Sequence, residues 1–172
     1  MTEKSLFDDV PSQSKSAVFS PCRKYRYALY RTWDERLASC MFVGLNPSTA
    51  DETKNDPTIR RCINFAKRWG CGGLIMANLF AFRATKPEDM KAAADPVGPE
   101  NDRWLIQLHN AAGLVIAAWG RDGVFRERGA KVLAMLRRNR DGGDIGCFGL
   151  TENKQPKHPL YIKGDTSYQI IQ

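Results

Sequence analysis

Two short segments of this sequence carry the residue types best suited to chemistry. Asn46 stands beside Pro47 at the end of the apolar run 40–45, and His158 stands beside Pro159 in a loop near the C-terminus. A carboxamide can orient a water molecule but has no useful basicity, whereas an imidazole can donate a hydrogen bond to an oxygen that becomes negative. We therefore take Asn46 and His158 as the candidate catalytic pair and interpret the chain as an enzyme core.

Each of these residues also has a structural alternative. An Asn-Pro pair after a strand is a common turn, so Asn46 is equally explained by backbone geometry. The chain has two histidines, and His109 falls in a helical pattern where a surface or packing role is expected. His158 lies in a loop between Pro156 and Pro159, and we expect it to belong to the site.

The elements that would position these residues alternate between strand and helix. Apolar or alternating runs predict strands at 26–33, 40–45, 74–78, 114–118 and 145–150. Capping signals and apolar residues at helical spacing predict helices that begin at Asp56-Pro57, at Thr85 with Glu88, at Pro99 and at Asp122. This order predicts an α/β fold with a central, mostly parallel sheet and helices on both faces.

The predicted architecture is a three-layer sandwich around a four-stranded sheet, with an N-terminal antiparallel hairpin added. The simplest hairpin pairs 26–33 with 40–45, because a short polar turn joins them. A length of 172 residues with 42% hydrophobic content favours one domain. We expect a flexible N-terminal arm at 1–20 and a single domain at 21–172.

Ligands of open α/β sheets lie outside the carboxyl ends of the strands. The residues that follow the four core runs are 46–49, 78–83, 119–122 and 158–161. These segments are rich in polar side chains, and we expect all four to share one edge of the sheet.

Composition limits the partners and the cofactors. The net charge of +7 favours a polyanionic partner, nucleic acid above all. The five cysteines show no Cys-x-x-Cys spacing, so no metal, iron–sulfur or disulfide site is indicated and no cofactor is expected. The N-terminus lacks a basic start followed by an apolar run, and no stretch is long enough to span a membrane, so we expect a cytoplasmic protein without a membrane partner. The oligomeric state is not indicated.

Four landmarks of the sequence resemble the uracil-DNA glycosylase superfamily over residues 40–165. Gly44-Leu45-Asn46-Pro47 is similar to its first motif and His158-Pro159-Leu160 to its last. Asn78 and Trp119-Gly120 occupy the places of its asparagine and Trp-Gly pair in the same order. The stretches 46–51, 56–61 and 158–161 also resemble an uncharacterised bacterial and phage family, domain of unknown function 1643, and the chain is identified as a member of it.

The glycosylase resemblance implies hydrolysis of the N-glycosidic bond of a modified or deaminated base in DNA. Asn46 would then orient the attacking water, and His158 would donate a hydrogen bond to the base oxygen as the base leaves. Asn78 would read the edge of a flipped base, with Phe80 or Phe82 stacked on it. The structural alternatives are a strand-end cap for Asn78 and core positions for the two phenylalanines. Ser48 follows the motif proline and would form part of the base-binding wall.

Contacts with the rest of a nucleic acid are expected around this pocket. Leu160 and Tyr161 follow His158-Pro159 and would act as a wedge in a duplex. A solvated charged face is the alternative for the basic residues. The residues expected to contact phosphates are Arg60, Arg61, Arg83 and Lys157.

The sequence leaves several alternatives open. Ser48-Thr49 and Leu160-Tyr161 depart from the glycosylase pattern, so the base and the strandedness of the substrate stay undecided. Asp51 and Asp56 are either carboxylates for acid–base work or Mg²⁺ binding, or simply loop and cap residues. The function is either that of a glycosylase, of a non-catalytic nucleic-acid or nucleotide sensor, or of a hydrolase of a free nucleoside or nucleotide.

Overall fold

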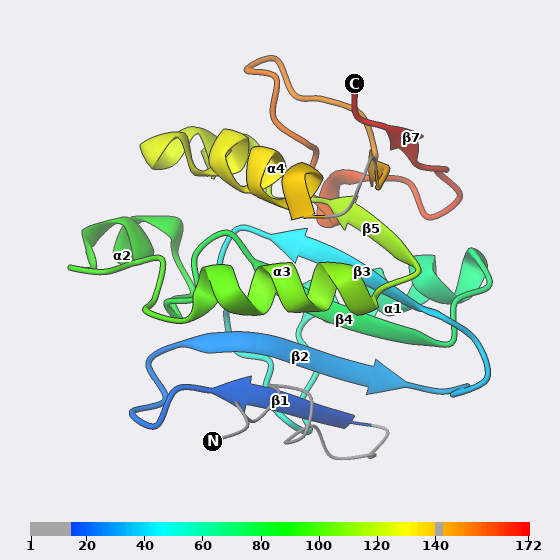
Figure 1. Ribbon diagram of the computed structural model, residues 1–172, viewed down its shortest axis with the longest axis horizontal. Coiled ribbons are helices and arrows are strands. Elements are labelled where there is room, and N and C mark those ends of the chain that lie inside the picture. The colour runs from blue at the N-terminus through cyan, green and yellow to red at the C-terminus, as the bar shows by residue number, and fades with distance from the viewer. Residues whose placement is uncertain (1–14, 140–142) are drawn as a thin grey trace.

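A sheet of seven strands organises the structure, a computed structural model that describes residues 15–139 and 143–172 (Figure 1). The strands cross the sheet in the order β1-β2-β4-β3-β5-β6-β7. Their bounds are Lys15–Phe19 (β1), Arg26–Thr32 (β2), Ser39–Gly44 (β3), Gly73–Asn78 (β4), Leu114–Ala117 (β5), Ile145–Cys147 (β6) and Gln169–Ile170 (β7). The helices are Pro57–Arg68 (α1), Pro87–Ala92 (α2), Asn101–Ala111 (α3) and Arg128–Asn139 (α4), with 3-10 helices at Arg121–Glu127 (η2) and Pro159–Tyr161 (η3).

Four neighbouring strands, β4, β3, β5 and β6, run parallel. The side chains of β4 are buried at every position, as a strand covered on both faces requires. The register places Gly44, the last residue of β3, opposite Asn78, the last residue of β4, and Val43 opposite Ala117 of β5. The carboxyl ends of these three strands therefore meet at one edge of the sheet.

The predicted α/β class and the parallel centre are confirmed, but the sheet is wider than the four strands expected. β1 and β2 form an antiparallel hairpin at one side, and β7 adds antiparallel to β6 at the other. Residues 15–19, which were assigned to the N-terminal arm, form β1. The remainder of the expected arm, residues 1–14, lies outside the described residues.

The predicted pairing of 26–33 with 40–45 is wrong, because β4 lies between these two strands. β2 pairs antiparallel with both β1 and β4. The turn after β2 is held to the start of β4, since the N–H groups of Trp33 and Asp34 donate to the Gly72 carbonyl at 2.9 and 3.0 Å. A fully buried strand needs a partner on each edge for its backbone groups, and β4 meets this need by entering between β2 and β3.

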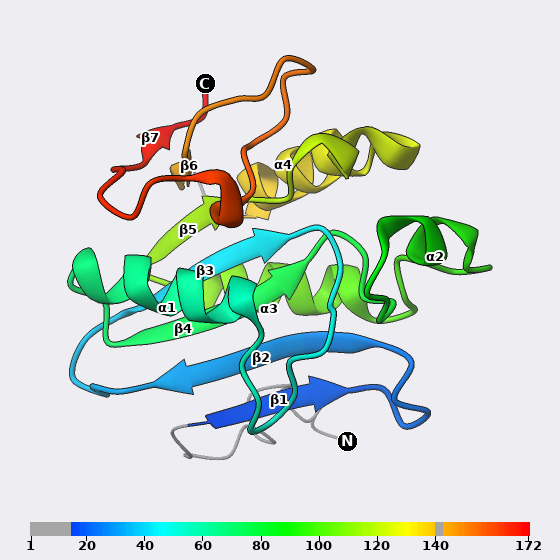
Figure 2. The same ribbon diagram turned by 180° about the vertical axis from the view of Figure 1, so that it is seen from behind.

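Helices cover both faces of the sheet, with α3 and α4 on one face and α1 on the other (Figures 1 and 2). Trp104 of α3 and Val132 of α4 belong to one hydrophobic core. Ile59 and Phe65 of α1 belong to a second core, together with Phe42 of β3.

No helix in the described part of the chain combines the length and the apolar character needed to cross a membrane.

Candidate functional site

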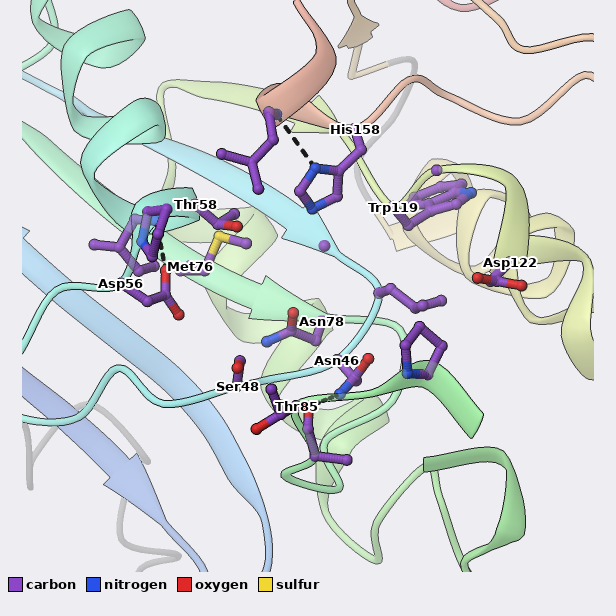
Figure 3. A pocket seen from close by; sticks show the side chains of 18 of the residues that line it. Asn46, Ser48, Asp56, Thr58, Met76, Asn78, Thr85, Trp119, Asp122 and His158 are labelled. Atoms are coloured by element: carbon purple, nitrogen blue, oxygen red, sulfur yellow. Dashed lines mark hydrogen bonds between the residues drawn. The ribbon is translucent and has the colours of Figure 1, made fainter. Parts of the chain in front are cut away.

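A cavity of about 610 Å³ lies at the carboxyl edge of the parallel strands (Figure 3). Residues from all four segments predicted from the strand ends line it, together with the start of α1. The side chains that matter most for the argument are those of Arg26, Asn46, Ser48, Asp56, Asn78 and His158. The structure therefore brings together residues that are more than 100 positions apart in the sequence.

Asn46 presents its amide oxygen to this cavity. Its Nδ2 donates to the Ala84 carbonyl at 2.8 Å and to the Pro47 carbonyl at 3.1 Å, which fixes the orientation of the amide. The Oδ1 atom accepts no hydrogen bond from the described residues. Asn46 can thus accept a hydrogen bond from a ligand or a water molecule.

Asn78 ends β4 with its side chain at the cavity wall and only 1% of its surface exposed. Neither Oδ1 nor Nδ2 has a hydrogen-bond partner among the described residues. A Cβ atom at Gly44 would lie 2.9 Å from this Oδ1, so glycine at the end of β3 leaves room for the amide. A buried amide without partners costs stability, and such groups in native proteins are typical of binding sites.

His158 is oriented by its own backbone neighbourhood. Its Nδ1 accepts a hydrogen bond from the N–H of Leu160 at 3.2 Å, as the N-cap of η3. Because Nδ1 is an acceptor, the proton of the neutral imidazole lies on Nε2. Figure 3 shows this second nitrogen directed toward the part of the cavity that Asn46 and Asn78 face.

Burial lowers the pKa of His158 below its ordinary value, and the charge of Asp56 opposes this shift. At neutral pH His158 is therefore a neutral donor. We expect its pKa, followed by long-range ¹H–¹⁵N NMR, to lie below 6.5 and to fall further in Asp56→Asn, since the carboxylate favours the imidazolium. His158→Gln identifies the resonance. A pKa above 6.5, or one that rises in Asp56→Asn, contradicts this assignment.

Gly120 and Arg61 hold the loop that carries His158. Gly120 has φ +76°, a backbone conformation that favours glycine, and its N–H donates to the Pro156 carbonyl at 2.8 Å. Arg61 donates from Nε to the Pro159 carbonyl at 3.3 Å and from Nη2 to the Ile162 carbonyl. Arg61, which was expected to contact phosphates, is thus occupied in anchoring η3 to α1.

Of the two acids considered in the sequence, Asp56 alone lines the cavity. Its Oδ1 caps α1 by accepting from the Ile59 N–H at 2.9 Å, as predicted. Asp51 instead closes a turn by accepting from the N–H groups of Thr53 and Lys54. The described residues form no group of three or more His, Cys, Asp or Glu side chains suited to a metal ion.

Phe80 and Phe82, expected to stack on a base, do not line the cavity. Phe80 is fully buried in the core and contacts Phe125 with ring centroids 5.6 Å apart. Phe82 packs edge-on against Tyr25 at 5.9 Å. The chain after β4 continues beside β3, because the Phe80 N–H donates to the Leu45 carbonyl, and this path directs both rings into the packed layers.

Of the remaining predicted residues, Leu160 and Tyr161 line the cavity, whereas Arg60, Arg83 and Lys157 do not. Leu160 and Tyr161 line the cavity mouth with 45% and 86% of their surfaces exposed. Arg60 and Lys157 are exposed. The Arg83 guanidinium instead stacks over the ring of Phe19 at 4.7 Å.

Sequence reasoning missed Arg26, a buried arginine in the cavity wall. Burial lowers the pKa of Arg26 to about 10, which leaves it protonated at neutral pH. Its side chain donates one hydrogen bond, from Nη1 to the Ala50 carbonyl at 2.9 Å. The sequence did contain a signal for this residue. Arg26 is a charged residue at the start of a strand whose apolar pattern predicts burial.

A protein-family model described as "Protein of unknown function (DUF1643)" matches residues 26–160 of the chain. No curated protein and no solved structure matches it.

Proposed function

The chain belongs to the DUF1643 family, and from the geometry of its cavity we propose that it recognises a nucleobase and hydrolyses the N-glycosidic bond that links the base to its sugar. The ordered motifs at Asn46, Asn78, Trp119 and His158, which resemble those of the uracil-DNA glycosylase superfamily, support the same activity. Four parallel strands with their polar residues at one edge are compatible with the fold of that superfamily.

The observation that carries this proposal is the pair of partnerless amide atoms on Asn78. The edges of nucleobases present hydrogen-bond donors and acceptors side by side. A carboxamide buried at a strand end offers N–H donors and an acceptor oxygen in the same plane, and so matches such an edge. Binding of a base would restore to Asn78 the hydrogen bonds that the described residues do not supply.

The residues around Asn78 suit the charges that develop when the glycosidic bond breaks. The C1′–N bond breaks with its electron pair going to the base, and His158 donates a hydrogen bond from Nε2 to the base oxygen that becomes negative. Water attacks C1′ while it donates a hydrogen bond to Asn46 Oδ1, and its proton passes to the departing base or to solvent. The negative charge of Asp56 would stabilise the positive charge that develops on the sugar.

The proposed substrate is a modified or deaminated base, carried either by DNA or by a free nucleotide. The net charge of +7 favours a polyanion. Leu160 and Tyr161, both exposed at the cavity mouth, are suitably placed to replace a base that leaves its stack.

The proposal is tested by measuring base release from a panel of substrates. Single- and double-stranded oligonucleotides with deaminated or modified bases, and the matching free nucleotides, are incubated with the wild-type chain and with the double variant Asn46→Ala/His158→Ala. Chromatography of the free base and cleavage at abasic sites report the product. Release from at least one substrate by wild type alone is expected. Binding of a substrate without release would show a sensor and overturn the hydrolase, and equal release by the double variant would overturn the assigned site.

A further inference from the structure

Two arginines of β2 are buried to the same degree but are used differently. Arg26 and Arg31 have 2% and 3% of their surfaces exposed. Arg31 makes five side-chain hydrogen bonds, and it does not line the cavity. Its acceptors are Asn55 Oδ1 and the carbonyl oxygens of Ser16, Tyr30, Asp51 and Lys54.

Within the described part of the chain, Arg26 by contrast has most of its donors without an acceptor. Its one side-chain hydrogen bond goes to the Ala50 carbonyl, and its Nε has no partner among the described residues. A guanidinium carries five N–H donors, and a buried positive charge without an ion pair costs folding free energy. No carboxylate of the described residues lies within 4.0 Å of Arg26 as an ion-pair partner. The same residue lines the cavity, so an anionic ligand there would supply what the protein does not.

The surroundings of Arg26 favour a phosphate group. Ser48 and Thr49, next to the Ala50 carbonyl that holds the guanidinium, also line the cavity and carry hydroxyl groups. Arginine and hydroxyl side chains are frequent phosphate ligands, because the planar guanidinium can donate two parallel hydrogen bonds. The cavity of about 610 Å³ is within the size range of small-molecule sites.

We propose that Arg26 binds the terminal phosphate of a nucleotide whose base is read by Asn78, which makes a free nucleoside monophosphate the substrate class of this site. The inference rests on the proposed function, because it takes the base-reading role of Asn78 as given. A terminal phosphate has a single ester linkage, so it can bind in a recess that is open on one side only. A backbone phosphodiester continues on both sides and would need a second opening beside Arg26, which is almost completely enclosed.

Asp56 is the negative group that most strongly influences Arg26, and it faces the same cavity. The other charges that act on Arg26 are Arg31, Arg83 and Asp51. Asp56 would repel a bound phosphate, so its removal should strengthen phosphate binding while the loss of Arg26 should weaken it. If Arg26 served folding only, phosphate binding would change neither on removal of Asp56 nor on removal of Arg26.

The test is isothermal titration calorimetry at moderate salt with four probes: a nucleoside, its 5′-monophosphate, inorganic phosphate and a short oligonucleotide that contains the same base. Wild type is expected to bind the monophosphate at least about tenfold more tightly than the nucleoside. Arg26→Gln should remove this difference and leave nucleoside affinity unchanged. Asp56→Asn should increase the difference, and Arg103→Gln, at an exposed site on α3 away from the cavity lining, should not affect it.

Each failure has a distinct meaning. Equal wild-type affinities for the nucleoside and its monophosphate overturn the phosphate subsite while leaving base recognition intact, and this comparison needs no variant to fold. Arg26-dependent binding of inorganic phosphate without binding of any nucleoside supports the subsite and contradicts the base-reading role of Asn78. Oligonucleotide binding that is as tight as monophosphate binding and equally dependent on Arg26 assigns the phosphate to a nucleic-acid backbone and overturns the free nucleotide.

Discussion

His158→Ala is expected to lower the rate of base release roughly 100- to 1,000-fold, the range observed when one preorganised donor to a developing oxyanion is removed. The effect is large because the Nε2 proton is held in place before the reaction. The Leu160 N–H occupies Nδ1, and burial keeps the ring neutral by lowering its pKa. Single-turnover rates at saturating enzyme separate this chemical step from binding.

His158→Gln is the matched control for this prediction. Its side-chain amide still carries an N–H donor near the position of Nε2, so we expect it to recover a substantial part of the rate that alanine loses. Substrate affinity should change little in both variants, because the hydrogen bond strengthens only as the base becomes negative. Rates of His158→Ala equal to wild type, or a glutamine variant that is no faster than alanine, would contradict the role of His158 as a donor.

Asn78→Leu is expected to raise the free energy of unfolding by about 1–3 kcal/mol and to abolish base recognition. The wild-type amide is buried with both of its polar atoms unpartnered, which destabilises the empty protein. Leucine has a similar branched shape without polar atoms, so folding no longer carries the desolvation penalty. Urea unfolding measures stability, and calorimetry with the ligand found in the panel measures recognition.

Asn101→Leu provides the opposite result at a comparably buried position. Asn101 is fully buried, and although its Oδ1 has no partner, its Nδ2 donates to the carbonyls of Asn78 and Leu79, both at 3.0 Å. Leucine here removes both hydrogen bonds, and although the Leu79 carbonyl still accepts from Arg128 Nε at 2.9 Å, we expect a loss of about 1–3 kcal/mol in unfolding free energy. If Asn78→Leu and Asn101→Leu lower the free energy of unfolding by equal amounts, Asn78 is a structural residue and the main support for a base-reading site is removed.

Local patterns in the sequence predicted the central strands and the helices, whereas β1 and β7 were missed and the predicted caps at Thr85 and Asp122 are not formed. The apolar run that ends at Asn78 and the cap at Asp56 are decided by neighbours within a few positions, and both appear in the structure as predicted. Parallel strands bring their carboxyl ends to one edge, so a strand order alone placed Asn46 and His158 near the same cavity.

Long-range contacts decided everything that depends on which segments become neighbours. The insertion of β4 between β2 and β3 follows from the need of a buried strand for two partners, which adjacent residues do not reveal. Long-range contacts also decide that Phe80 is buried in the core and that Arg61 anchors η3.

The sequence by itself determined the central strands, the α/β class with its parallel centre and the polar residues that follow those strands, because these follow from residue spacing along a few turns of chain. Only the tertiary structure decided which buried polar groups have partners. Arg31 is saturated and Arg26 is not, and Asn101 is bonded while Asn78 has an unpartnered amide, although each pair shares one residue type and similar burial. Hydrogen-bond satisfaction depends on groups brought together across the fold, and it is this property that marks the site.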